Sequence, residues 1–173
     1  MILGNKACFT RDHLDAQKGV APGPLCELVV YSLELVSQLA NKGLEFRFKG
    51  GNSQLILLEE PQRFSIDADI VTTVPKEELI ALVESIAEDC ELFSRCEVRQ
   101  HKTKPWLPMV SFKLFFKSVY GDDDGAPEDP NVMLDAVLEP APYPGLRKRI
   151  RCGDLYVADQ TVVVIVGEGV HAT

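Results

Sequence analysis

Apolar residues recur with a helical period in separate parts of the chain. Between residues 25 and 42 they fall on one face of a helix, at Leu25, Leu28, Val29, Leu33, Leu35, Val36 and Leu39. A second amphipathic segment runs from Pro75 to about Asp89 and has acids in its first turn. Thr10 is placed to cap a short helix over residues 11–18. The pattern therefore predicts helices at these three places.

Alternation of apolar and polar residues predicts strands elsewhere. Leu44, Phe46 and Phe48 alternate with charged residues, as in a half-buried strand. The Gly50–Gly51 pair then forms a tight turn, from which residues 52–59 leave as a short helix. Further strands are expected over residues 64–72, 92–100, 108–118, 131–139 and 161–166. Helices first, then strands with helices between them, predict one α+β domain over residues 1–173, with a mixed sheet flanked by helices.

The composition indicates the cellular environment of such a domain. The chain is 46% hydrophobic and 25% charged, which is ordinary for a soluble globular protein. No apolar run approaches the roughly 20 residues that span a bilayer, so no membrane partner is expected. The five cysteines are odd in number, scattered and without C-x-x-C spacing, which favours reduced thiols and a cytoplasmic location. They are Cys8, Cys26, Cys90, Cys96 and Cys152.

Charge is unevenly distributed along the chain. The net charge of −8 gives no global field that would attract nucleic acid. Basic residues are nevertheless grouped in two stretches: Arg95, Arg99, Lys102 and Lys104, and then Arg147, Lys148, Arg149 and Arg151. Each group is consistent with a solvated face. Each is also consistent with a path for a triphosphate or an RNA backbone.

Two acids lie two positions apart in the strand expected at 64–72. Because alternate residues of a strand share a face, Asp67 and Asp69 point the same way. Such a pair raises its own pKa values unless a cation lies between the carboxylates. Magnesium, bound by one or two carboxylates and substrate phosphates, suits this place, and a pair of metal ions would clamp an in-line phosphoryl displacement. A solvated strand face with two acids is the alternative.

The glycine turn favours the metal hypothesis. Gly50 and Gly51 join a strand to a helix, so their backbone N–H groups can closely approach an anion. Ser53 adds a hydroxyl in the first turn of that helix. A double glycine alone is only a tight turn. Placed shortly before the acid pair, it fits a triphosphate and a metal ion held together.

Two later strands carry further candidates. Asp135 lies in the middle of the apolar strand expected at 131–139, where an acid is costly unless it is paired or bound to metal. This favours a metal-binding or general-base role. Lys113, on the strand expected at 108–118, could neutralise a triphosphate as charge develops in the transition state. The alternative is an exposed lysine whose ammonium reaches water.

These motifs together resemble a known family. The run Phe48-Lys49-Gly50-Gly51-Asn52-Ser53, then Arg63-Phe64-Ser65-Ile66-Asp67-Ala68-Asp69, is similar to the motifs of AbiEii/AbiGii-type nucleotidyltransferases, in the DNA polymerase beta-like superfamily. Lys113 and Leu134-Asp135 match two later family elements, and the resemblance covers most of residues 10–140. It implies a nucleotidyltransferase fold with nucleotide-binding residues Lys49, Gly50, Gly51, Ser53 and Arg63. The implied metal ligands are Asp67, Asp69 and Asp135, and Lys113 completes the catalytic set.

The resemblance implies an enzyme that moves a nucleoside monophosphate from an NTP to an acceptor, using Mg²⁺ or, in its place, Mn²⁺. The preferred acceptor is tRNA or another RNA, with a protein hydroxyl or a small molecule as the alternative. Many relatives are toxins of toxin–antitoxin or phage-defence systems, which implies an antitoxin partner.

The chain departs from the family pattern at two points. Asn52 replaces the usual threonine, and the chain stops short of the helical region that usually follows the Leu-Asp strand. A second hypothesis therefore stays open: a nucleotide-binding or partner-binding module that keeps the fold and has lost turnover.

Overall fold

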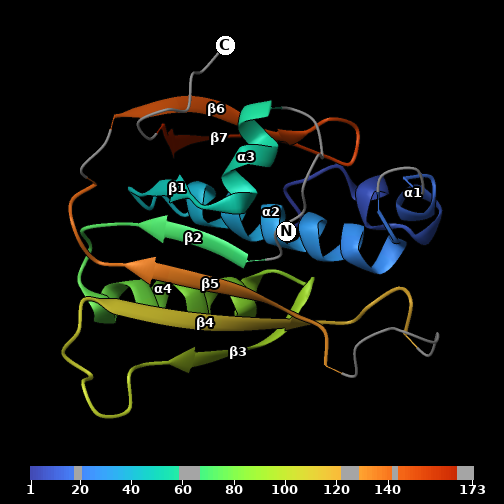
Figure 1. Ribbon diagram of the computed structural model, residues 1–173. Helices are drawn as coiled ribbons and strands as arrows, with labels where there is room; N and C mark the ends of the chain where they lie inside the picture. Colours follow the sequence, from blue (N-terminus) through green and yellow to red (C-terminus); the bar gives the residue numbers. More distant parts are fainter. Residues whose placement is uncertain (18–20, 59–66, 122–128, 142–143, 167–173) are drawn as a thin grey trace.

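The computed structural model describes residues 1–17, 21–58, 67–121, 129–141 and 144–166 (Figure 1). The helices are the 3₁₀ helix η1 (Lys6–Phe9), α1 (Arg11–Asp15), α2 (Gly23–Asn41), α3 (Gly51–Leu58) and α4 (Lys76–Asp89). The strands are β1 (Arg47–Lys49), β2 (Asp67–Val71), β3 (Phe93–Arg99), β4 (Met109–Phe116), β5 (Asn131–Val137), β6 (Gly145–Cys152) and β7 (Tyr156–Ile165). No helix in these ranges is long and apolar enough to cross a membrane.

The described strands form one mixed sheet in the order β3-β4-β5-β2-β1-β7-β6. β2 runs parallel to β5 and β1 runs parallel to β7, whereas the other neighbours are antiparallel. Figure 1 shows α2 and α4 behind this sheet, and the two helices contact different strands: α2 contacts β7, β5 and β2, and α4 contacts β3 and β4. This arrangement is consistent with the predicted α+β class.

The predicted helix signals agree with the structure. The Thr10 hydroxyl accepts a hydrogen bond from the His13 backbone at 3.3 Å, which confirms the cap of α1. Helix α2 begins two residues before the predicted Leu25, because Pro22 takes the N-cap position and Pro24 fits the first turn. After α2, Gly43 turns the chain at a φ of 81°, a conformation that favours glycine.

The end of the chain differs most from the sequence-based expectation. Strand β7 extends over Tyr156–Ile165 rather than 161–166. Strand β6 was not predicted, because its consecutive basic residues Arg147, Lys148 and Arg149 conceal any alternation of apolar and polar positions. It lies at the edge of the sheet beside β7, where most of its side chains face solvent. Solvent exposure explains why a charged strand is stable here.

Strand alternation determines which face of the sheet forms the core. Phe48, Ile70, Phe112 and Leu134 are fully buried on β1, β2, β4 and β5. Most residues that alternate with them are only partly buried, with Val71 and Phe115 as buried exceptions. Since successive strand residues point to opposite faces, the core lies on the face with α2 and α4. The opposite face is left for polar side chains.

A fully buried acid on α2 joins three parts of the fold. The Glu34 carboxylate accepts hydrogen bonds from the Leu3 backbone at 3.1 Å, the Gly4 backbone at 2.7 Å, Gln38 Nε2 at 2.8 Å and the Tyr156 hydroxyl at 3.1 Å. A buried carboxylate is costly unless such donors surround it. These four donors connect the N-terminal segment, α2 and β7.

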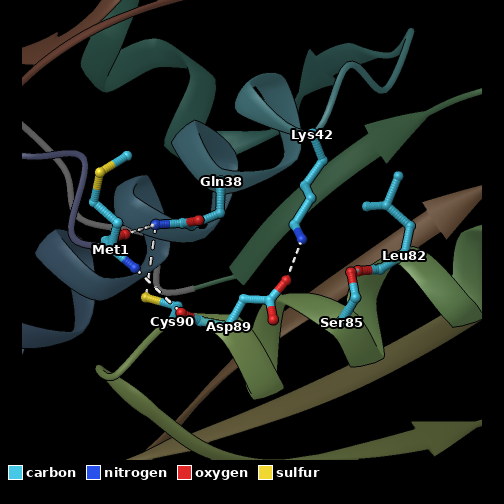
Figure 2. A network of polar contacts seen from close by, with 7 residues as sticks. All are labelled: Met1, Gln38, Lys42, Leu82, Ser85, Asp89 and Cys90. Carbon is cyan, nitrogen blue, oxygen red and sulfur yellow. Dashed lines mark hydrogen bonds and ion pairs between the residues drawn. The ribbon is translucent and has the colours of Figure 1, made fainter.

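Figure 2 shows how this network reaches α4. Gln38 Nε2 also donates to the Met1 carbonyl at 2.8 Å and lies 3.6 Å from Cys90 Sγ, just beyond the end of α4. Lys42 Nζ pairs with Asp89 Oδ2 at 2.5 Å, at the solvent-exposed end of the contact. The buried contacts of Gln38 contribute more to the α2–α4 packing than this ion pair does, because exposed ion pairs contribute little.

We predict that Glu34→Gln lowers the free energy of unfolding by roughly 1.5–3 kcal/mol, because the neutral amide keeps one acceptor oxygen for four donors. Urea unfolding followed by circular dichroism measures the change. Glu91→Gln makes the same chemical change at an exposed position and is the matched control. Equal midpoints for the two variants would contradict a structural role for the buried carboxylate.

Candidate active site

Four neighbouring strands bring polar side chains into one row across the open face of the sheet. The strand register places Lys49 of β1 opposite Asp69 of β2. Asp69 lies opposite Asp135 of β5, which lies opposite Ser111 of β4. Directly opposed residues have side chains on the same face. The structure therefore brings Asp69 and Asp135 together, although they lie 66 positions apart in the chain.

A second row lies one step along the strands. Asp67 of β2 is opposite Met133 of β5, and Met133 is opposite Lys113 of β4. Lys113 is therefore on the predicted face but two strands from Asp67, or about 10 Å at the backbone. On its other side it faces Glu97 of β3. A lysine side chain can span much of that distance toward a bound anion, so the role predicted for Lys113 stays a prediction.

Ser111 fixes the orientation of Asp135. The Ser111 hydroxyl donates a hydrogen bond to Asp135 Oδ1 at 2.6 Å. This bond orients the carboxylate and leaves Oδ2 for another partner. The sequence pattern alone does not indicate a role for Ser111. The signal was its position two residues before Lys113 on the same strand face, but only the register shows that it adjoins an acid.

Burial and like charge act on both residues of the acid pair. Burial, and secondly the neighbouring Asp135, raise the pKa of Asp67. Burial and Asp135 also raise the pKa of Asp69, while Lys49 lowers it and Asp67 raises it further. The three acids thus form an electrostatically unfavourable group when all are ionised. A bound cation would relieve this repulsion.

The glycine turn packs directly against one of these acids. Gly50 has a φ of 80°, and a Cβ at this position would lie 2.3 Å from Asp69 Oδ2. Both facts require glycine here. The Ser53 hydroxyl donates to the Gly50 carbonyl at 2.6 Å and so closes the turn that begins α3 at Gly51. The side chain of Asp69 and the start of α3 are therefore held next to each other.

Asn52 is fully buried, and its Nδ2 donates to Ser32 Oγ of α2 at 2.7 Å, so its side chain supports the packing between helices. Its Oδ1 is buried without a hydrogen-bond partner. Arg63, predicted to contact the nucleotide, lies outside the described residues.

A pocket of about 680 Å³ opens one row further along the open face. Charged and polar groups from several strands and loops line it, among them Arg47, Arg147, Glu45, Glu139 and Gln160. The Gln160 Oε1 atom is buried without a hydrogen-bond partner. The volume is typical of pockets that bind small molecules. The pocket and the Gly50 turn lie on opposite sides of the row that contains Asp69, because Arg47 precedes Lys49 on β1 and Gly50 follows it.

The second basic group is largely occupied by the β6–β7 hairpin itself. Arg149 pairs with Asp159 at 3.0 Å and Arg151 with Asp154 at 3.8 Å. Arg147 donates to a hydroxyl of β7 at 3.1 Å. For Arg149 and Arg151, the solvated-face interpretation is therefore the better one. Arg147 also borders the pocket.

The metal-binding prediction rests on donor type rather than on a formed cluster. Among the described residues, no three or more His, Cys, Asp or Glu side chains lie together so as to hold a metal ion. The donor set nevertheless fits magnesium, because it consists of carboxylates from adjacent strands about 4.8 Å apart. Rotation of the Asp69 and Asp135 side chains would let both reach one ion. Metal binding thus stays a prediction.

The model of a known protein family matches most of the chain. The model of the family described as "Nucleotidyl transferase AbiEii toxin, Type IV TA system" matches residues 34–160. That range contains the glycine turn, the three acids and Lys113. No curated protein matches the chain.

We predict that Asp135→Asn stabilises the metal-free protein at pH 7 by roughly 0.2–1 kcal/mol, because it removes one of two like charges on opposed residues. Because the pKa values of Asp67 and Asp69 are raised, ionisation of these groups destabilises the folded protein as pH rises above the ordinary carboxyl range near 4. The gain should therefore shrink as pH falls toward that range and be absent below it. Urea unfolding of the wild type and the variant in EDTA, at pH 7 and again below the carboxyl range, measures this gain in the free energy of unfolding.

Asp159→Asn is the control for sign, since Asp159 lies beside Arg149 rather than beside another acid. That change should be neutral or slightly destabilising. Destabilisation by Asp135→Asn at pH 7 would show that like-charge repulsion does not dominate at the site.

Proposed function

Since the chain belongs to the AbiEii family of nucleotidyltransferase toxins, from type IV toxin–antitoxin systems, we propose that it transfers a nucleoside monophosphate from an NTP to an RNA hydroxyl. The proposed metal is magnesium, with Asp67, Asp69 and Asp135 as ligands. The observation that carries the proposal is the direct opposition of Asp69 and Asp135, with Gly50 packed against the Asp69 carboxylate.

The turn at Gly50 supports a triphosphate site beside the acids. Gly51 begins α3, so the first N–H groups of that helix lie at this turn. Such groups bind anions well, and the helix dipole adds to the attraction. Lys49 directly precedes the turn and shares a row with Asp69, which places a positive charge nearby. We assign Lys49, Gly50, Gly51, Ser53 and Arg63 to the triphosphate, with Ser53 acting through the shape of the turn.

The side chains of β4 and β5 fit the proton transfer. In the proposed reaction an acceptor hydroxyl oxygen forms a bond to the α-phosphorus, the bond to the bridging oxygen breaks, and pyrophosphate leaves. Asp135 accepts the hydroxyl proton at Oδ2, while Ser111 holds Oδ1. Lys113 approaches the charge that develops on the phosphates. When bound, magnesium neutralises phosphate charge and orients the nucleotide.

RNA, and tRNA in particular, is the proposed acceptor ahead of a protein hydroxyl. The family name places the chain in a toxin–antitoxin system, so we also propose an antitoxin protein as a partner. The contrasting hypothesis, a binding module without turnover, predicts the same nucleotide site but no transferred label. Turnover therefore decides between the two.

We predict that Asp67→Asn combined with Asp69→Asn reduces magnesium-dependent transfer from radiolabelled NTPs to bulk tRNA by more than about a hundredfold, since loss of charge stabilisation in a transition state has effects of this size. Asp159→Asn is the control and should transfer label like the wild type. Label transfer by the double variant would contradict the metal site. Metal-dependent NTP binding by the wild type without transfer would instead favour the binding module.

We predict that Gly50→Ala lowers transfer about a hundredfold, because the added Cβ displaces the Asp69 carboxylate and sub-ångström placement matters in catalysis. Gly43→Ala is a matched control, because Gly43 has nearly the same φ and no atom within 4 Å of the added Cβ. Backbone strain should cost both variants roughly 1–2 kcal/mol of stability. Equal activity of the two variants would show that Gly50 acts only through backbone conformation.

A further inference from the structure

The loop between β3 and β4 exposes the only tryptophan of the chain. Trp106 is 74% exposed, whereas large aromatic side chains usually contribute to the core. The residues before it give it no apolar cover, because every residue from 99 to 106 is exposed, and Leu107 after it is half-buried. Figure 1 shows this loop projecting from the end of the sheet. Trp106 therefore has no evident role in the packing of the described residues.

The backbone on both sides of Trp106 is held in place. Lys76 Nζ, at the start of α4, donates to the Pro105 carbonyl at 2.6 Å and to the Leu107 carbonyl at 2.9 Å. Earlier in the loop, His101 Nδ1 accepts from the Lys104 backbone at 3.0 Å. A loop fixed by such contacts presents its side chain at a low cost in conformational entropy. The structure thus presents an exposed indole on an ordered loop.

The stretch of sequence that carries this indole is positively charged, against the overall charge of the chain. Between Glu97 and Asp122 the sequence contains no acid and five basic residues, in a chain of net charge −8. Three of them precede the indole closely: Arg99, Lys102 and Lys104. Basic residues with an interleaved aromatic ring are typical of surfaces that bind single-stranded nucleic acid, since bases stack on the ring and phosphates contact the cations.

The position of the loop relative to the acids agrees with such a partner. Arg99, where β3 ends, lies opposite Ser111, the residue that orients Asp135. Met109 begins β4 two residues before Ser111, so the loop and the Gly50 turn lie at opposite ends of the row of acids. In an in-line displacement the nucleophile approaches the side away from the leaving group. With pyrophosphate leaving on the Gly50 side, the acceptor enters on the side of the loop.

From these observations we propose that Trp106, Lys102 and Lys104 form the binding surface for the single-stranded acceptor end of the RNA. A base stacks on the Trp106 indole, and the two lysines contact neighbouring phosphates. This inference rests on the proposed RNA acceptor and assigns it a surface outside the metal site. It commits to RNA as occupant, and not to the antitoxin, because the charge and the exposed ring match single-stranded nucleic acid.

Trp106 is itself the probe for the test, because its fluorescence is the only indole signal of the chain. The full chain is titrated with single-stranded oligoadenylate, with the same RNA annealed to its complement, and with polyglutamate, in EDTA and without NTP. We expect saturable quenching by the single strand alone. Absence of quenching, or equal quenching by polyglutamate, would overturn the proposal.

Affinities of variants are then measured by anisotropy of labelled oligoadenylate. Trp106→Ala should bind at least about fivefold more weakly, from the usual contribution of one stacked base. Lys102→Gln with Lys104→Gln should reduce the slope of log affinity against log salt by about 1.4. The charge-matched control Lys6→Gln with Lys117→Gln removes two exposed lysines elsewhere and should keep the wild-type affinity. Unchanged affinity of Trp106→Ala would overturn the assignment.

This binding test and the transfer test fail independently. The Asp67→Asn and Asp69→Asn double variant should still quench Trp106 fluorescence on binding RNA, because the loop lies outside the metal site. Quenching without label transfer in the wild type would contradict the proposed reaction alone. Transfer to tRNA that is unaffected by Trp106→Ala would contradict the loop surface alone.

Discussion

The parallel register of β2 with β5 is the constraint on which the candidate site depends. It places Asp69 opposite Asp135 and so brings together acids from distant parts of the chain. A shift of one residue would point Asp135 into the core and Leu134 toward the open face, because alternate residues of a strand face opposite ways. The buried residues Leu134 and Ala136 prevent that shift. Core packing therefore positions the polar site.

The acids of the site repel one another, whereas the buried carboxylate of Glu34 is well compensated. Glu34 has four hydrogen-bond donors around its carboxylate and serves the fold. Asp69 instead has two acids nearby, Asp135 and Asp67, with Lys49 opposite it on β1, and it packs against a glycine with φ of 80°. Buried acids with like-charged neighbours are typical of functional sites, since a ligand supplies the missing compensation. This contrast separates the structural acid from the catalytic candidates.

On the open face of the sheet, positively charged residues lie on both sides of the acids. The glycine turn, next to Lys49, lies on one side of the acid row, while the pocket bordered by Arg47 and the β3–β4 loop lie on the other side. In the proposed transfer from an NTP to RNA, positive charge on both sides of the acids would attract the phosphates of the two substrates. The chain achieves this locally in spite of its net charge of −8.

The sequence by itself determined the motifs of the candidate site and most of the helices and strands. The Gly50 turn, the alternation around Asp67 and Asp69, and the helical periods of α2 and α4 are local patterns, so a linear sequence displays them. Sequence also placed Asp135 in an apolar strand. It failed at β6, where charged residues conceal the alternation of a solvent-exposed edge strand.

Only the tertiary structure decided which of these residues meet. Strand order and register join Asp135 to Asp69, place Ser111 on Asp135, and separate Lys113 from Asp67 by two strands. The structure also shows that Asn52 bonds to α2 and that Lys76 bonds to the backbone on both sides of Trp106. Both contacts join segments that are distant in the sequence. Such pairings follow from the packing of the whole chain, which local spacing in a sequence does not encode.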